Sequence, residues 1–130
     1  MARQQTRAEP FGLPWFNMIL LTTRSLPVDI TVVELSGRLA LGNSLREAED
    51  AIKKLVREGS KKVIVDLSNI ELTDSAGIGM LMMCHSTAAE ANASFRVAGA
   101  NERVASIFRV TRVDQILSLF ASTKDAAAGF

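Results

Sequence analysis

Residues 63–79 read VIVDLSNIELTDSAGIG, in which an apolar, β-branched run passes into a polar turn. Such a run predicts a buried strand. The turn ends in Asp74 and Ser75, where a helix is expected to start. Helix starts carry unpaired N–H groups and a partial positive charge, so they favour an anion. A hydroxyl at Ser75 could therefore cap the helix, or it could accept a phosphate and act as a switch.

The composition is that of an ordinary single-domain globular protein. The chain has 130 residues, of which 48% are apolar and 22% charged, and its net charge is +1. This charge gives no reason to expect direct binding to nucleic acid or to an acidic membrane surface. Tyrosine is absent and aromatic residues make up 5%, which is too few for the stacking platforms that bind single-stranded nucleic acid.

Three features bear on the compartment. Cys84 is the single cysteine, so an internal disulfide cannot form, which fits a reducing cytoplasm. No apolar run approaches the ~20 residues of a membrane-spanning helix. Near the N-terminus, Pro10, Gly12 and Pro14 interrupt the apolar stretch, so it does not resemble a signal peptide. We expect a cytoplasmic protein without membrane insertion.

The chain is expected to divide into an N-terminal extension, residues 1–17, and one domain, residues 18–130. The extension is polar and then broken by Pro and Gly, and it contains Phe11, Trp15 and Phe16. The favoured interpretation is a flexible or non-native extension, since chain ends are usually loose. The alternative is an arm that docks on a neighbouring molecule.

The first half of the domain shows alternating strand and helix patterns. Residues 18–24 are expected to be an edge strand, residues 26–29 a turn, and residues 30–37 a strand with one buried face. A helix should begin at Ser44, which forms a capping box with Glu47, and end before Gly59. Residues 62–67 then form a short central strand.

The second half continues the alternation. The predicted elements are a helix over residues 75–91, a strand over 94–98, a helix over 102–110, a short strand or turn over 115–120, and a last helix over 122–128 that Ser122 caps. Strands that alternate with helices in this way predict an α/β fold, with a mixed sheet and helices packed against it.

Several segments in this order resemble the STAS domain, the fold of bacterial anti-sigma factor antagonists. They are ITVVELSGRL at residues 30–39, the helix after Ser44, VDLS at residues 65–68, TDSAGIG at residues 73–79 and VAG at residues 97–99 with the helix that follows. The resemblance covers residues 18–130. It implies the STAS fold, with a mixed four- to five-stranded β-sheet and α-helices packed against it.

The resemblance also implies a function. In this family the serine after the aspartate, here Ser75, is phosphorylated by an anti-sigma factor that is also a serine kinase. The unphosphorylated antagonist binds that kinase and releases a sigma factor, phosphorylation ends the binding, and a metal-dependent serine phosphatase resets the cycle. The expected partner-binding residues are Asp74, Ser75, Ala76, Gly77, Ile78, Gly79, Arg38 and Asn43. No catalysis, metal or cofactor is expected of the chain itself, and self-association into a homodimer stays open.

Two departures from the family pattern concern the partner. The position after the phosphoserine, often Ser or Thr in the family, is Ala76, which removes a second adjacent acceptor. Many members carry an acidic residue two or three positions after the glycine that is here Gly37, and that place is taken by Ala40. A changed charge pattern at the rim of a protein–protein interface alters the choice of partner more than it alters the fold.

Other interpretations of the same residues remain. Ser75 could act only as a helix cap, and Asp74 could bond the helix start or contact the partner. Asp66 could cap a turn or orient the Ser75 loop, both of them structural roles. The chain could also be a STAS scaffold in a sensory or transporter-associated complex without phosphotransfer. A small flavodoxin-like enzyme is disfavoured because the chain lacks a glycine-rich phosphate loop and an acid/base cluster.

The remaining chemistry-bearing residues are expected to be structural. Cys84 and His85 are adjacent and so lie ~100° apart on a helix, which excludes a shared zinc site or a catalytic pair. Met80, Met82 and Met83 are expected mostly in the core, with one or two beside Ser75, where methionine gives adaptable contact.

Overall fold

The computed structural model describes residues 7–11 and 19–130, with side chains placed for residues 19–130. The strands are β1 (Arg7–Phe11), β2 (Ile19–Leu26), β3 (Ile30–Leu39), β4 (Lys62–Thr73), β5 (Ser94–Ala98) and β6 (Ser118–Phe120). The helices are α1 (Asn43–Arg57), α2 (Ser75–Glu90), α3 (Glu102–Val110) and α4 (Thr123–Ala127), with a 3-10 turn, η1, at Val113–Gln115.

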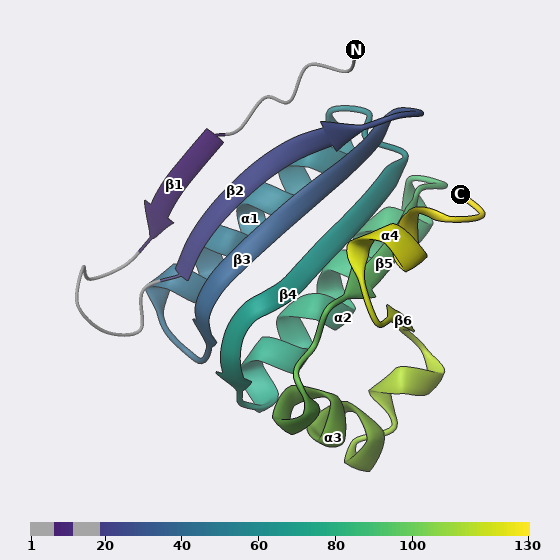
Figure 1. Ribbon diagram of the computed structural model, residues 1–130. Helices are drawn as coiled ribbons and strands as arrows, with labels where there is room; N and C mark the ends of the chain where they lie inside the picture. Colours follow the sequence, from purple (N-terminus) through teal and green to yellow (C-terminus); the bar gives the residue numbers. More distant parts are fainter. Residues whose placement is uncertain (1–6, 12–18) are drawn as a thin grey trace.

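The strands form one mixed sheet in the order β1-β2-β3-β4-β5-β6 (Figure 1). The pairs β1–β2 and β2–β3 are antiparallel, and the pairs from β3 to β6 are parallel. Helices α1, α2 and α3 connect the parallel strands, as crossover connections require. The five strands β2 to β6 and their helices confirm the α/β fold expected for residues 18–130.

The first predicted strand is confirmed, but its place at the edge is wrong. β1 pairs with β2 on the outer side, from Arg7 opposite Thr23 to Phe11 opposite Ile19. This sixth strand comes from the predicted extension, whose RAEPF sequence has low strand propensity and a proline. The rest of that extension, with Trp15 and Phe16, lies outside the described residues, so the docking arm stays an open alternative.

The two faces of the sheet are covered to different extents. Helices α1 and α2 lie together on one face, and α4 lies on the other (Figure 1). The larger core lies under α1 and α2 and includes Val33, Leu35, Val65 and Leu81, all fully buried. The smaller core, under α4, consists of Ile30, Val32, Ile64, Ala98 and Ala126. Alternate residues of each strand serve the two cores because side chains alternate across a strand.

The predicted cap of α1 is wrong. The N-cap residue is Gly42, and no side chain caps this helix. Ser44 instead lies one residue inside α1 and is buried, and its Oγ accepts the backbone N–H of Ile19 at 2.7 Å. This contact joins the start of β2 to α1 across 25 residues of sequence, so a local capping pattern could not reveal it.

The predicted central strand is longer than expected. β4 continues from Leu67 to Thr73, with two irregularities in its pairing with β3. The carboxylate of Asp66 accepts the N–H and the hydroxyl of Ser68, at 3.0 and 2.5 Å. These bonds satisfy the polar groups of Asp66 and Ser68, which interrupt the apolar pattern of the strand. Beyond them, Ile70 and Thr73 of β4 are buried again. The longer strand carries the chain to the start of α2.

Candidate partner-binding and phosphorylation site

Ser75 is the first residue of α2 and lies at the carboxyl end of β4, where its side chain is exposed. The parallel strands β3 and β4 end side by side here, with Leu39 opposite Thr73. Loops that follow the carboxyl ends of parallel strands are the usual ligand-binding positions of α/β folds. The sequence thus places a hydroxyl at an accessible helix start.

Asp74, and not Ser75, caps α2. Its Oδ1 accepts the backbone N–H of Gly77 at 3.0 Å, and its Oδ2 accepts the backbone N–H of Leu41, also at 3.0 Å. Partial burial acts to raise the pKa of this carboxyl, but hydrogen bonds from the N–H groups of Leu41, Gly77 and Ala76 hold the pKa below its ordinary value. The carboxylate therefore satisfies the helix start and leaves the Ser75 hydroxyl free of the capping role.

Gly77 makes the close approach of α2 to β3 possible. A Cβ at this buried position would lie 2.3 Å from the carbonyl oxygen of Leu39 and 2.3 Å from Oγ1 of Thr73. That hydroxyl already donates to the same Leu39 carbonyl at 3.1 Å. Gly79 differs, because a Cβ there would meet nothing within 4 Å. Gly77 thus has a packing role, and Gly79 leaves the exposed helix surface bare.

The loop between β3 and α1 lies against the Ser75 turn. The backbone N–H of Asp74 donates to the carbonyl of Leu39 at 3.0 Å, which adds to the Leu41–Asp74 bond. Arg38 is exposed, and its Nε lies 3.2 Å from Oε2 of Glu71 on β4. Asn43 is exposed at the first position of α1. Arg38 and Asn43 thus flank the loop that contacts the Ser75 turn.

The predicted partner-binding residues divide by exposure. Ser75, Gly79, Arg38 and Asn43 are exposed, and Asp74 and Ala76 are half-buried. Gly77 and Ile78 are buried, so they support the surface from below and cannot present side chains to a partner. Leu41, an exposed residue of the same loop, was not among the predicted residues.

A shallow pocket of about 460 Å³ adjoins this surface between β3, β4 and α3. It is lined by Arg38, Glu71, Leu72, Asn101, Glu102 and Arg103. Asn101 caps α3 by accepting the N–H of Val104 at 2.8 Å, and it donates to the carbonyls of Ile70 and Glu71. The start of α3 is thereby fixed to the end of β4, close to the site.

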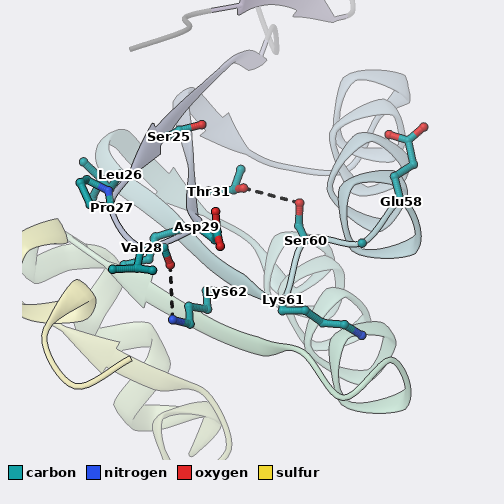
Figure 2. Close-up of a pocket in the computed structure, with 12 residues that line it drawn as sticks. Ser25, Leu26, Pro27, Val28, Asp29, Thr31, Glu58, Ser60, Lys61 and Lys62 are labelled. Atoms are coloured by element: carbon teal, nitrogen blue, oxygen red, sulfur yellow. Dashed lines mark hydrogen bonds between the residues drawn. The ribbon is translucent and has the colours of Figure 1, made fainter. Parts of the chain in front are cut away.

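A larger pocket, of about 830 Å³, lies at the other end of the strands (Figure 2). The β2–β3 turn and the loop before β4 line it. Nζ of Lys62 donates to the carbonyl of Val28 at 3.3 Å, and the hydroxyls of Thr31 and Ser60 lie 3.5 Å apart. Its two lysines are matched by Asp29 and Glu58, so the lining has no net charge to select an ion.

Cys84, His85 and Met80 are structural residues. Cys84 is fully buried, and this burial, together with the nearby Glu49 carboxylate, raises the pKa of its thiol to about 12. His85 packs edge-on against Phe95, with ring centroids 6.3 Å apart. Met80 is buried, whereas Met83 is 51% exposed on α2.

Within residues 7–11 and 19–130, no group of three or more His, Cys, Asp or Glu could hold a metal ion. In the same part of the chain, every helix is too short or too polar to cross a bilayer.

The fold and the sequence together define the class of protein. A family model described as "Mlab, STAS domain" matches residues 23–119. This match runs from within β2 to within β6 and includes the Ser75 turn. The chain belongs to the STAS domain family, which confirms the resemblance found in the sequence.

The most similar proteins include anti-sigma factor antagonists. A Thermotoga neapolitana protein assigned by name to that class is 20% identical over 98 residues, 75% of this chain and 87% of its own. An anti-sigma factor antagonist from Mycobacterium paratuberculosis superposes with a TM-score of 0.73 at 21% identity, over 83% of this chain and 90% of its own. The phosphorylated form of the Bacillus cell fate determinant SpoIIAA superposes with a TM-score of 0.64 at 13% identity, over 82% and 95%. At these identities the superpositions establish the shared fold.

Proposed function

We propose that this protein is an anti-sigma factor antagonist whose binding to an anti-sigma factor serine kinase is switched off by phosphorylation of Ser75. The observation that carries the proposal is the exposed Ser75 hydroxyl at the start of α2, where Asp74 takes the capping role. The naming of relatives as anti-sigma factor antagonists supports it.

The chemistry belongs to the partner. The Ser75 oxygen attacks the γ-phosphorus of ATP, ADP leaves, and the serine proton passes to a base on the kinase. The bare surface at Gly79, one helical turn from Ser75, leaves room for a kinase active site to reach the hydroxyl. The chain is thus a substrate and a binding module, not an enzyme, and it works with the kinase in the cytoplasm.

The switch follows from charge. A phosphate adds about 1.5–2 negative charges near neutral pH. The helix start tolerates this charge, so the fold survives, but Asp74 adds a second negative charge in the adjacent residue. A partner that fits the neutral hydroxyl must then accept or desolvate a dianion, and each ~1.4 kcal/mol lost weakens binding tenfold. A serine phosphatase returns the protein to its binding form.

Phosphate incorporation tests the proposal. Wild type, Ser75→Ala and Ser86→Ala are each treated with ATP, magnesium and the purified anti-sigma factor kinases of the same cell, and intact mass is measured. Ser86 is the matched control because it is another exposed serine of α2. We expect one phosphate on wild type and on Ser86→Ala, and none on Ser75→Ala. Equal labelling of all three would assign the phosphate elsewhere. No labelling of wild type by any kinase would favour a STAS scaffold without phosphotransfer.

A further inference from the structure

Leu41, in the loop between β3 and α1, has an exposure that folding alone does not explain. The residue is 76% exposed although its side chain is fully apolar. The loop is held in place, because the N–H of Leu41 donates to Asp74 and the N–H of Asp74 donates to the carbonyl of Leu39, both at 3.0 Å. The Leu41 side chain is therefore presented from a fixed backbone next to Ser75.

Helix α2 extends this surface without charge. Residues 75–89 contain no Asp, Glu, Lys or Arg, whereas α1 carries seven such residues among its fifteen. Gly79 and Met83 follow Ser75 at four-residue steps, so they share its face of the helix, and both are exposed. Helix faces that meet water usually carry charged residues, while the centres of protein interfaces are depleted of charge and enriched in methionine.

We propose that Leu41 is the specificity-determining anchor of this protein, inserting into an apolar, uncharged pocket on the kinase that acts on Ser75. Asp74 is the positioning residue that presents it. The inference rests on the proposed function and adds to it the chemistry of the partner. An isolated exposed leucine would need no explanation, but this one is pinned beside the modification site and adjoins an uncharged helix face.

Calorimetry of Leu41 variants tests the anchor. The kinase that labels Ser75 is titrated with unphosphorylated protein in the presence of ADP, so that no phosphate is transferred. We expect Leu41→Met to bind within about threefold of wild type, and Leu41→Ala to bind about ten- to a hundredfold more weakly, the range for burying a leucine side chain. Leu41→Asp should show no measurable binding. The ratio of the wild-type and Leu41→Ala affinities should change by less than about threefold between 50 and 500 mM salt, because the Leu41 contact carries no charge.

Val28→Ala is the matched control. Val28 is 69% exposed, and it precedes β3 whereas Leu41 follows it, so the two lie at opposite ends of that strand. Leu41→Ala and Val28→Ala could bind the kinase with equal affinity while the kinase, supplied with ATP, still phosphorylates Ser75 in both. That result would overturn the role of Leu41 and leave the proposed function standing. Absence of both binding and labelling of wild type by every kinase would overturn the proposed function together with it. Sedimentation that shows a wild-type dimer lost in Leu41→Asp, with kinase binding unchanged, would assign the surface to a second copy and also overturn it.

A double-mutant cycle separates positioning from general damage. If Asp74 acts through Leu41, the Leu41→Ala substitution should weaken binding much less in an Asp74→Ala background than in wild type. Circular dichroism and Ser75 labelling show that each variant is folded and recognised. Additive losses in affinity would mean that Asp74 does not present Leu41, and would overturn the positioning role.

Discussion

Asp74 joins three parts of the site through one side chain and one backbone group. Its carboxylate receives N–H groups from α2 and from the loop after β3, and its own N–H bonds the end of β3. It also lies beside the Ser75 hydroxyl. The two roles considered for Asp74 from sequence, bonding the helix start and serving the partner surface, are therefore compatible.

The pH dependence of the protein's stability should reveal the contribution of the Asp74 carboxylate. Its pKa is lowered in the folded state, so its contribution is present above the unfolded pKa of about 3.9 and is lost as pH falls through the folded pKa. Asp74→Asn keeps one acceptor oxygen for the cap, but its NH2 group cannot accept the second N–H, so it should be less stable than wild type by about 1 kcal/mol at pH 7, the usual scale of one hydrogen bond. The difference should shrink below pH 3. Melting temperatures of both proteins from pH 2 to 7 check this, and a constant difference over the whole range would contradict it.

The two glycines after Ser75 should respond to alanine with opposite signs. Gly77→Ala forces a Cβ against the Leu39 carbonyl and should cost roughly 1–3 kcal/mol, as overpacking does. Gly79→Ala meets nothing and should be neutral or stabilising by up to about 1 kcal/mol, because alanine favours helix. Urea unfolding of the pair measures both values. A Gly77→Ala protein as stable as wild type would contradict the packing role.

Among the helices and strands, sequence patterns correctly predicted bounds and caps that depend on hydrogen bonds between residues close together in the sequence. The helix over Glu102–Val110 and the strand over Ser94–Ala98 have the expected bounds, and Ser122 caps α4 by accepting the N–H of Asp125 at 3.1 Å. The sequence patterns gave wrong caps or bounds where a residue far away in the sequence supplies the hydrogen-bond partner. Ser44 bonds Ile19 instead of its own helix, and the continuation of β4 depends on irregular pairing with β3.

The functional site could be predicted only in part, because some of its contacts are local in the sequence and others are not. The Ser75 turn is a local motif, so its place at the start of α2 could be foreseen. The place of Leu41 beside the Ser75 turn involves its hydrogen bond to Asp74, which lies 33 residues further along the chain. A one-dimensional pattern gives no distance across that gap.

Arg96 bonds the C-terminal helix to the sheet, in addition to the apolar packing of Ala126. The guanidinium of Arg96 on β5 donates to the carbonyls of Ala126 and Ala128 at 2.7 and 3.0 Å, and it stacks on Phe130 at 3.9 Å from the ring centroid. Lysine keeps the charge but loses the planar fork and much of the stacking.

Arg96→Lys should therefore loosen α4 without unfolding the sheet. We expect the melting temperature to fall by a few degrees and hydrogen exchange to accelerate at the amides of Ala126 and Ala128, which bond within α4. The amide of Val97, in the centre of the sheet, is the internal control. Unchanged exchange at Ala126 and Ala128 would show that Arg96 does not hold the helix.

At the scale of the whole molecule, structural and functional roles lie in different places. α1 and α2 cover the larger core, and α4 closes the smaller one on the opposite face (Figure 1). The Ser75 surface lies at the carboxyl ends of β3 and β4, outside both cores. A charge added at Ser75 can thus change binding while the cores that maintain the fold stay intact.

The phosphate charge at Ser75 is proposed to control partner binding. Protein fully phosphorylated at Ser75, verified by mass, and unphosphorylated protein are titrated by calorimetry into the kinase that labels Ser75, with ADP present. Circular dichroism should show the same fold for both forms. We expect the unphosphorylated form to bind more tightly by about tenfold or more, which corresponds to ~1.4 kcal/mol or more. Equal affinities of the two forms would contradict it.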